Sequence, residues 1–226
     1  MSIQDFAVRP QLSDDVARLI RARIFDGTYA AGAYIRLELL AAELGISVTP
    51  VREALFALRA EGLIDQQPRR GFRVLPVTGR DVTDVANVQA HVGGELAARA
   101  AVRITDEQVH ELAEIQASLE QAYAGDDHER TVRLNHDFHR AINVAAGSPK
   151  LAQMMSQITR YAPEAVFPAI DGWPKQSMKD HRRILSALAA HDENRARAAM
   201  SDHLAAGALP LIDHLVARGV LVDGPE

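Results

Sequence analysis

The chain has 226 residues, of which 47% are hydrophobic and 24% charged, with a formal net charge of -5 and no cysteine. This length can form one large or two modest globular domains. The absence of cysteine excludes disulfides, thiol nucleophiles and thiolate metal sites, so a metal ion could be held only by nitrogen and oxygen ligands. No apolar run reaches the roughly 20 residues that cross a bilayer, and the first residues lack the order of a signal peptide. We therefore expect a cytoplasmic protein without a membrane partner.

The sequence changes character near Pro76. Alanine and leucine at helical spacing dominate most of the chain, whereas residues 63–77 combine short alternating apolar stretches with a Pro-Arg-Arg-Gly turn that predicts a small β-hairpin. Residues 1–76 carry ten arginines against nine acids, and residues 77–226 carry fifteen basic against twenty-one acidic side chains. We expect two domains, 1–76 and 77–226, with a mainly α fold.

The residue pattern of the first domain predicts a helix, a short helix, a third helix and a hairpin. Apolar residues from Leu12 follow helical spacing up to Asp26-Gly27, with Ser13 as a candidate cap. A short helix then ends at Gly45, and a third begins at Thr49-Pro50 and ends at Gly62. This order is typical of a winged helix-turn-helix DNA-binding domain, in which the second helix of the motif enters the major groove.

Three arginines are the candidate DNA contacts on this interpretation. Arg52 lies in the exposed first turns of the third helix, and Arg69 and Arg70 lie at the tip of the hairpin, where they could follow the phosphates or the minor groove. Surface arginines are also common without any such role, and the near-neutral charge of the domain makes a weak electrostatic case. From the residues alone, both the DNA-binding interpretation and the purely structural one remain open.

The second domain is predicted to be an antiparallel helical bundle with an interior pocket. Its helices are expected at 81–102, 105–124, 127–146, 149–161, 174–190 and 194–218.

Three of these helices each turn a histidine toward their apolar side. His139, His181 and His203 align with the apolar stripes of their helices, and Asn135 precedes His139 by one turn on the same side. A single buried histidine is usually a satisfied core residue. Three imidazoles that meet an amide oxygen suit zinc, nickel or a similar divalent ion with positions left for water or a ligand.

The first domain resembles the DNA-binding domain of the GntR superfamily of bacterial transcription regulators. The resemblance rests on LAAELGIS, TPVREAL, the EGL that closes the third helix and the PRRGF of the wing. It implies Thr49, Arg52, Arg69 and Arg70 as DNA contacts, with Ser47 capping the helix or touching phosphate. The family usually has an arginine where this chain has Val48, which could touch a thymine methyl but cannot make a bidentate contact to guanine, so the resemblance does not give the operator sequence.

The second domain resembles the FCD ligand-binding domain of the FadR subgroup. The matching pieces are NHDFH, DHRRILSAL and MSDHL. The resemblance implies a metal held by Asn135, His139, His181 and His203, with asparagine in the place of the usual acid, and a small carboxylic acid as effector. Where the family often has an arginine, this chain has Gln89, which could hydrogen-bond an effector but cannot pair with it ionically.

We thus predict a regulator that is not an enzyme. It would bind a palindromic operator as a homodimer and sense a small organic acid in a metal-containing pocket. Two alternatives are a metal-dependent hydrolase or lyase, and a sensor whose effector is the metal ion itself. The sequence lacks a well-placed general base for the first, with Glu95, Glu164 and Asp180 scattered outside any motif.

Overall fold

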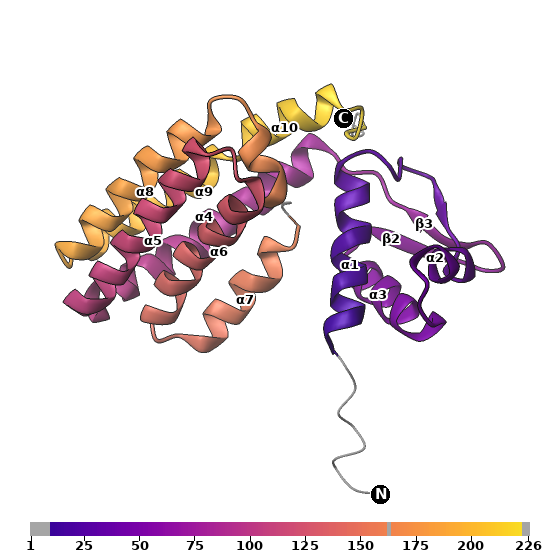
Figure 1. Cartoon of the computed structure of the whole chain (residues 1–226), viewed down its shortest axis with the longest axis horizontal. Coiled ribbons are helices and arrows are strands. Elements are labelled where there is room, and N and C mark those ends of the chain that lie inside the picture. Colours follow the sequence, from indigo (N-terminus) through magenta and orange to yellow (C-terminus); the bar gives the residue numbers. More distant parts are fainter. Residues whose placement is uncertain (1–9, 162–163, 223–226) are drawn as a thin grey trace, which may run out of the picture. The chain divides into compact units, whose positions relative to one another are not determined.

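The computed structural model describes residues 10–161 and 164–222, which form two compact units (Figure 1). The first unit runs to Gly79 and also takes in the chain from Leu215, and the second is Arg80–His214. A parallel β-bridge between Val77 and Leu221 ties the C-terminal segment to the first unit, and within it the backbone N–H of Val222 donates to the carbonyl of Val77 at 3.1 Å. The division thus differs from a simple cut of the chain at Pro76.

The first unit has the predicted helices and hairpin. The helices are α1 (Pro10–Phe25), α2 (Leu37–Leu44) and α3 (Val48–Ala60). The strands are β1 (Tyr34–Ile35), β2 (Ile64–Gln67) and β3 (Gly71–Val74), in the antiparallel order β1-β3-β2. Strand β1 was not predicted, because two residues cannot show a strand's alternation. Ser13 lies inside α1, so its expected role as the cap of that helix is wrong.

A continuous apolar core holds α3 in place. Helices α1 and α2 both pack on α3, and Ile20, Val51, Leu55 and Leu58 are fully buried between them. Because these residues recur at helical spacing, they occupy one face of each helix and leave the other face of α3 exposed. At the end of α3, the Arg21 guanidinium forms an ion pair with Glu61 at 2.7 Å.

The wing depends on a glycine directly after its tip, at the start of β3. Gly71 has a φ of 97°, and a Cβ at this position would lie 2.6 Å from the carbonyl oxygen of Ile35 in β1. Only glycine lets β3 approach β1 this closely without moving the backbone. The PRRGF pattern therefore contains both the exposed arginines and the residue that allows the sheet to close.

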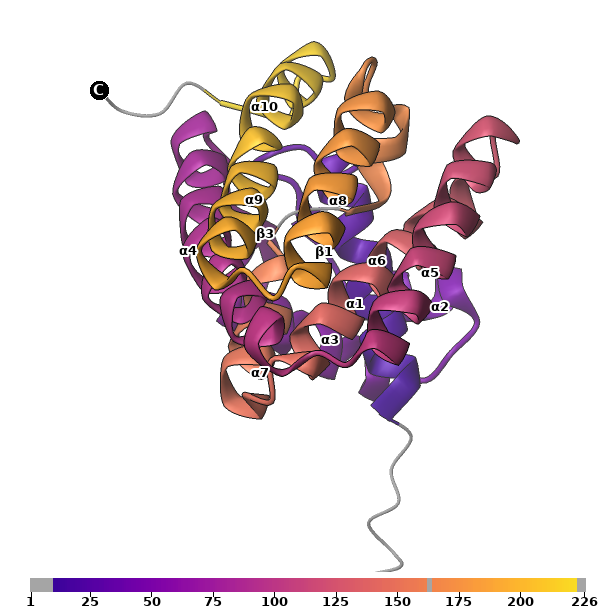
Figure 2. The same cartoon turned by 90° about the vertical axis from the view of Figure 1, so that its left-hand side faces the viewer.

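The second unit is a helical bundle, as predicted (Figure 2). Helix α8 packs against α5 and α9, and α5 also packs against α6. The bundle has an apolar core that includes Leu96, Phe138, Ile142, Ile184 and Leu188. The helices are α4 (Gly79–Arg103), α5 (Asp106–Ala124), α6 (His128–Ala145), α7 (Pro149–Thr159), α8 (Trp173–Ala189) and α9 (Glu193–Ala206), with the 3-10 helix η2 (Glu164–Ala169) before α8, and α10 (Ala208–Ala217) follows α9.

The long final helix expected at 194–218 is wrong, because it is divided at Gly207 into α9 and α10. Pro210 has no N–H to donate to the carbonyl of Ala206, so the ladder of a continuous helix is broken there. Gly207 also packs closely on aromatic rings: a Cβ would lie 3.2 Å from Phe167 and 3.3 Å from Trp173. The break thereby brings two aromatic side chains against the end of α9.

Candidate functional site

The exposed side of α3 carries the predicted DNA contacts of the helix-turn-helix. Thr49 and Arg52 lie in its first turns with exposed side chains. Ser47 is the N-cap residue, with extended backbone angles of φ −69° and ψ 159°, but its side chain makes no capping hydrogen bond. Its exposed hydroxyl is therefore available to another partner, and Val48 follows as the first residue of the helix.

The tip of the wing presents two cations. Arg69 and Arg70 occupy the turn between β2 and β3, and both side chains are exposed. Arg69 has a φ of 64°, an uncommon value for a residue with a side chain, which turns the backbone within the tip. Both arginines are thus placed at the end of a short hairpin, where long cationic side chains can reach phosphate oxygens.

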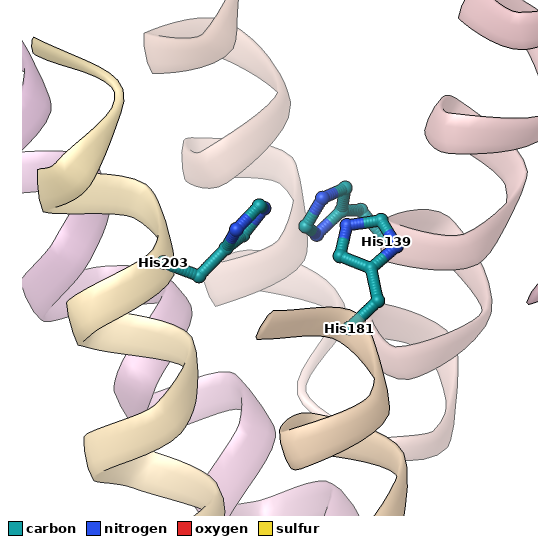
Figure 3. Close-up of side chains that lie close together, drawn as sticks. All are labelled: His139, His181 and His203. Carbon is teal, nitrogen blue, oxygen red and sulfur yellow. The ribbon is translucent and has the colours of Figure 1, made fainter. Parts of the chain in front are cut away.

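The second unit brings His139, His181 and His203 together (Figure 3). They come from α6, α8 and α9, and their imidazole rings turn toward one another. Ring centroids lie 5.1 Å apart for His139 and His181, 5.2 Å for His139 and His203, and 4.8 Å for His181 and His203. One nitrogen from each ring lies within 4.8 Å of the other two. Nitrogens around one zinc ion lie roughly 3.4 Å apart, so small ring rotations would close the set around an ion.

Burial keeps at least two of these imidazoles neutral. Loss of solvent is the main cause that lowers the pKa of His139 to about 3, and the nearby His203 and His136 add to it. His139 retains some accessible surface even though protein atoms surround its ring closely. Burial also lowers the pKa of His181 well below its usual value. A neutral imidazole keeps the lone pair that a metal requires.

Aromatic side chains fix the orientation of the histidine rings. Phe138 stacks on His181 with centroids 4.2 Å apart and an interplanar angle of 6°. Trp173 stacks on His203 at 5.8 Å, and Phe167 packs on Trp173 at 4.9 Å. Stacking limits these rings to small rotations, so the donors stay close to one another before any ligand binds.

The donor set fits a divalent ion. The Nε2 of His181 and the Nδ1 of His203 are buried and make no hydrogen bond within the described residues. An unpaired buried nitrogen costs roughly 1–3 kcal/mol, a cost that coordination of an ion would remove. Neutral imidazoles are good ligands for zinc and nickel, and three of them leave coordination positions open.

Asp180 is a member of this site that the sequence interpretation set aside. Its carboxylate is almost fully buried and lies 3.7 Å from the Nδ1 of His203, too far for a hydrogen bond. His203 beside it is the main cause that lowers the pKa of Asp180, and Gln176 donates to its Oδ2 at 2.9 Å. Asp180 therefore supplies a buried negative charge next to the histidines. No sequence signal assigns it, because its place directly before His181 does not show that its side chain faces His203.

Asn135 and Gln89 occupy different positions relative to the histidines. Asn135 lies one turn before His139 on α6 and is partly exposed, so its role as a ligand stays a prediction. Gln89 is buried on α4, and its amide donates to the carbonyl of Ile158 at 3.3 Å. It lines a mainly apolar cavity of about 20 Å³ with Phe167 and Leu204, room for roughly one water molecule.

Two family models match this chain. The model of the gntR family of bacterial regulatory proteins matches residues 12–74, and that of the FCD domain matches residues 84–206. The chain belongs to the GntR family, with a C-terminal FCD domain. This confirms the resemblance on which the sequence interpretation rested, and it makes the protein a DNA-binding transcription regulator and not an enzyme.

Relatives of similar length support the same assignment. The regulator McbR of Escherichia coli is 28% identical over 183 residues, 78% of this chain and 81% of that one. A probable repressor of a D-xylose utilization operon from Paenarthrobacter nicotinovorans is 28% identical over 88% of each chain.

Solved structures share the fold. That of E. coli McbR/YncC has a TM-score of 0.73 at 24% identity, covering 91% of this chain and 99% of that one. That of Listeria monocytogenes Lar has a TM-score of 0.59 at 19% identity over the same shares. No helix among the described residues is long and apolar enough to span a bilayer.

Proposed function

We propose that this GntR-family protein is a cytoplasmic, homodimeric regulator that reads a palindromic operator and responds to a ligand in its FCD domain. Arg52 and Thr49 would contact base edges from α3, Ser47 a phosphate, and Arg69 and Arg70 the backbone or minor groove beside it. The exposure of all five side chains supports this assignment. One recognition helix covers only a few base pairs, so two copies related by a two-fold axis are needed for a specific site.

The FCD unit would hold the two copies together. Large apolar side chains are exposed on its outer helices, with Val88 48% and Val102 63% exposed on α4, and Met154 56% exposed on α7. Val88 and Val102 are 14 residues apart, which places them within about 40° on one face of α4. Pairing these surfaces between two copies would remove apolar area from water.

The same unit would bind a divalent ion, zinc or a similar metal such as nickel, through His139, His181 and His203, with Asn135 as an oxygen ligand. The observation that carries this proposal is the meeting of three imidazoles from three helices, two of which, His181 and His203, have a buried nitrogen without a hydrogen bond among the described residues. Bound there, the ion would supply Lewis acidity for an anionic group. Asp180 would balance part of its charge, since Asn135 carries none.

A small carboxylic acid is the effector we propose, bound at the open side of the ion with Gln89 as a hydrogen-bonding residue on α4. The cavity at Gln89 holds about one water, so such a ligand must displace side chains to enter. That displacement gives the ligand different affinities for two conformations, which linkage requires of any effector.

Two measurements test the proposal. Fluorescence anisotropy with the protein's own promoter region should show binding that weakens as salt rises, and absence of such binding would refute the DNA-reading half. Elemental analysis of the purified protein should find a divalent metal, and Asn135→Asp should retain more of it because a carboxylate is the stronger donor. Equal or lower retention would remove Asn135 from the ligand set.

A second candidate is a sensor of the metal ion itself, which the small size of the Gln89 cavity favours. The two candidates separate in one titration. Zinc added alone to metal-free protein would change DNA affinity if the ion is the effector, and would leave it unchanged if an organic acid is required.

A further inference from the structure

A glutamine on α5 contacts the histidine site from outside the set of proposed ligands. The Oε1 of Gln116 lies 2.9 Å from the Nδ1 of His181, although 65 positions separate the two residues in the chain. Gln116 is 3% exposed, and α5 packs directly on α8. This contact is buried, so its direction has a chemical consequence for His181.

Neighbouring groups determine which end of the Gln116 amide faces His181. The Nε2 of Gln116 donates to the Oε1 of Glu120 at 2.9 Å and approaches the Sδ of Met178 at 3.2 Å. The hydrogen bond from Arg182 is the largest cause that lowers the pKa of Glu120, and the charge of Arg182 adds to it. This carboxylate is therefore ionised and can only accept hydrogen bonds. The amide nitrogen must therefore face Glu120, and the amide oxygen must face His181.

Arg182 completes this arrangement. Its Nε lies 3.0 Å from Oε1 of Glu120, and its Nη2 lies 2.8 Å from Oε2. The guanidinium binds both carboxylate oxygens and holds Glu120 against Gln116. We call Gln116, Glu120 and Arg182 the relay.

We infer that Gln116, held by Glu120 and Arg182, is a positioning residue that selects the tautomer of His181 with a proton on Nδ1 and a free lone pair on Nε2. An amide oxygen can only accept, so Nδ1 must donate. The inference rests on the proposed metal site, since the freed lone pair is the one that would bind the ion. The Nε2 of His181 is buried and makes no hydrogen bond within the described part of the chain, so no donor there competes for this lone pair.

Gln116 within the relay differs from an ordinary buried glutamine because it controls the tautomer of His181. A second hydrogen bond on a ligating imidazole fixes its ring and tautomer, and loss of such a partner typically costs 10–100-fold in metal affinity. A purely structural glutamine would change stability when replaced, but would leave the tautomer of His181 unchanged. The tautomer is therefore the decisive readout.

The test measures this tautomer by 15N NMR of the histidine ring nitrogens in full-length, metal-free protein, and zinc affinity by competition with a chromophoric chelator. In the wild type we expect a proton on Nδ1 of His181. Gln116→Met keeps the volume but removes the acceptor, so it should shift His181 toward the Nε2-protonated form and weaken zinc binding 10–100-fold.

A swap variant keeps the inference testable if Gln116→Met does not fold. The combination of Gln116→Glu and Glu120→Gln preserves the net charge. The carboxylate at position 116 can then accept the hydrogen bond from Nδ1 of His181, and the amide at position 120 can donate to that carboxylate. This double variant should keep the wild-type tautomer and bind zinc within a few-fold of the wild type. The matched control is Gln108→Met, on the same helix, whose side chain takes part in the capping box with Thr105 and contacts no histidine of the site, and which should leave both readouts unchanged.

The outcomes separate the inference from the proposed function. A wild-type His181 protonated on Nε2, or a Gln116→Met variant with unchanged tautomer and zinc affinity, would overturn the role of Gln116 while leaving the metal centre in place. If wild-type protein binds no zinc, the metal centre fails, and the tautomer in metal-free protein still decides whether Gln116 positions His181.

Discussion

The two units present their candidate functional groups in opposite ways. In the winged helix-turn-helix, Thr49, Arg52, Arg69 and Arg70 are exposed and lie within about twenty positions of one another in the chain. In the FCD unit, His139, His181 and His203 come from three helices; His181 and His203 are buried, and His139 is only partly exposed. A surface that meets a charged polymer needs only local geometry, whereas an ion site needs donors from several directions. The first can be recognised as a motif, and the second depends on packing.

The largest effect is expected when one imidazole is removed from the histidine site. His181→Ala should lower zinc affinity by more than about 100-fold, since loss of a ligand exceeds the 10–100-fold typical of an outer partner. DNA binding by the metal-free protein should be unchanged, because the first unit carries its own core. Chelator competition and anisotropy measure the two effects. His110→Ala, at an exposed histidine of the same unit, is the control; a similar zinc loss there would contradict the assignment.

On the side of the first unit, Arg52→Ala should weaken operator binding by about 1–3 kcal/mol and relax specificity at one base position. A base-edge contact is sequence-specific, so binding to unrelated DNA should fall less. Anisotropy with operator and scrambled duplexes measures the difference. Arg59→Ala, in the last turn of the same helix, is the matched control. Equal losses on both duplexes would make Arg52 a phosphate contact.

A smaller effect on zinc affinity is expected when the buried negative charge of Asp180 is removed. Asp180→Asn removes the charge beside His203 with little change in size, and zinc affinity should fall about tenfold, the low end expected for an outer partner. Asp202→Asn is the control, because that carboxylate is 62% exposed and contacts the same Arg183. If both variants bind zinc equally well, Asp180 has no part in the site.

The smallest expected effect is at the wing. Arg70→Ala should weaken binding to all duplexes alike and reduce the slope of log affinity against log salt by about 1, as for one lost phosphate contact. A salt titration measures the slope, with Arg73→Ala on β3 as the comparison. A change confined to the operator would instead place Arg70 on a base edge.

Much of the fold followed from the pattern of residues alone. Helical spacing of Leu, Val and Ala, together with glycines and prolines at the ends, located the α-helices apart from the break at Gly207, but it did not predict the 3-10 helix η2. At Gly207 a regular apolar pattern on both sides concealed the missing hydrogen bond at Pro210. The two-residue β1 was missed because its pairing with β3 is a tertiary contact.

The residues of the histidine site also fall into those that the sequence predicted and those that only the structure identified. His139, His181 and His203 could be found from sequence because each aligns with the apolar stripe of its own helix, a local property. Gln116 and Asp180 could not be assigned, since nothing near them in the chain states that α5 packs on α8 or that Asp180 faces His203.

The sequence by itself determined the family, the winged helix-turn-helix and the candidate ligands, because periodicity, turn residues and motifs act over short distances along the chain. Only the tertiary structure decided which nitrogen of His181 is free and which carboxylate lies beside His203. Hydrogen-bond direction and buried charge arise between side chains that only packing brings within a few ångströms of each other.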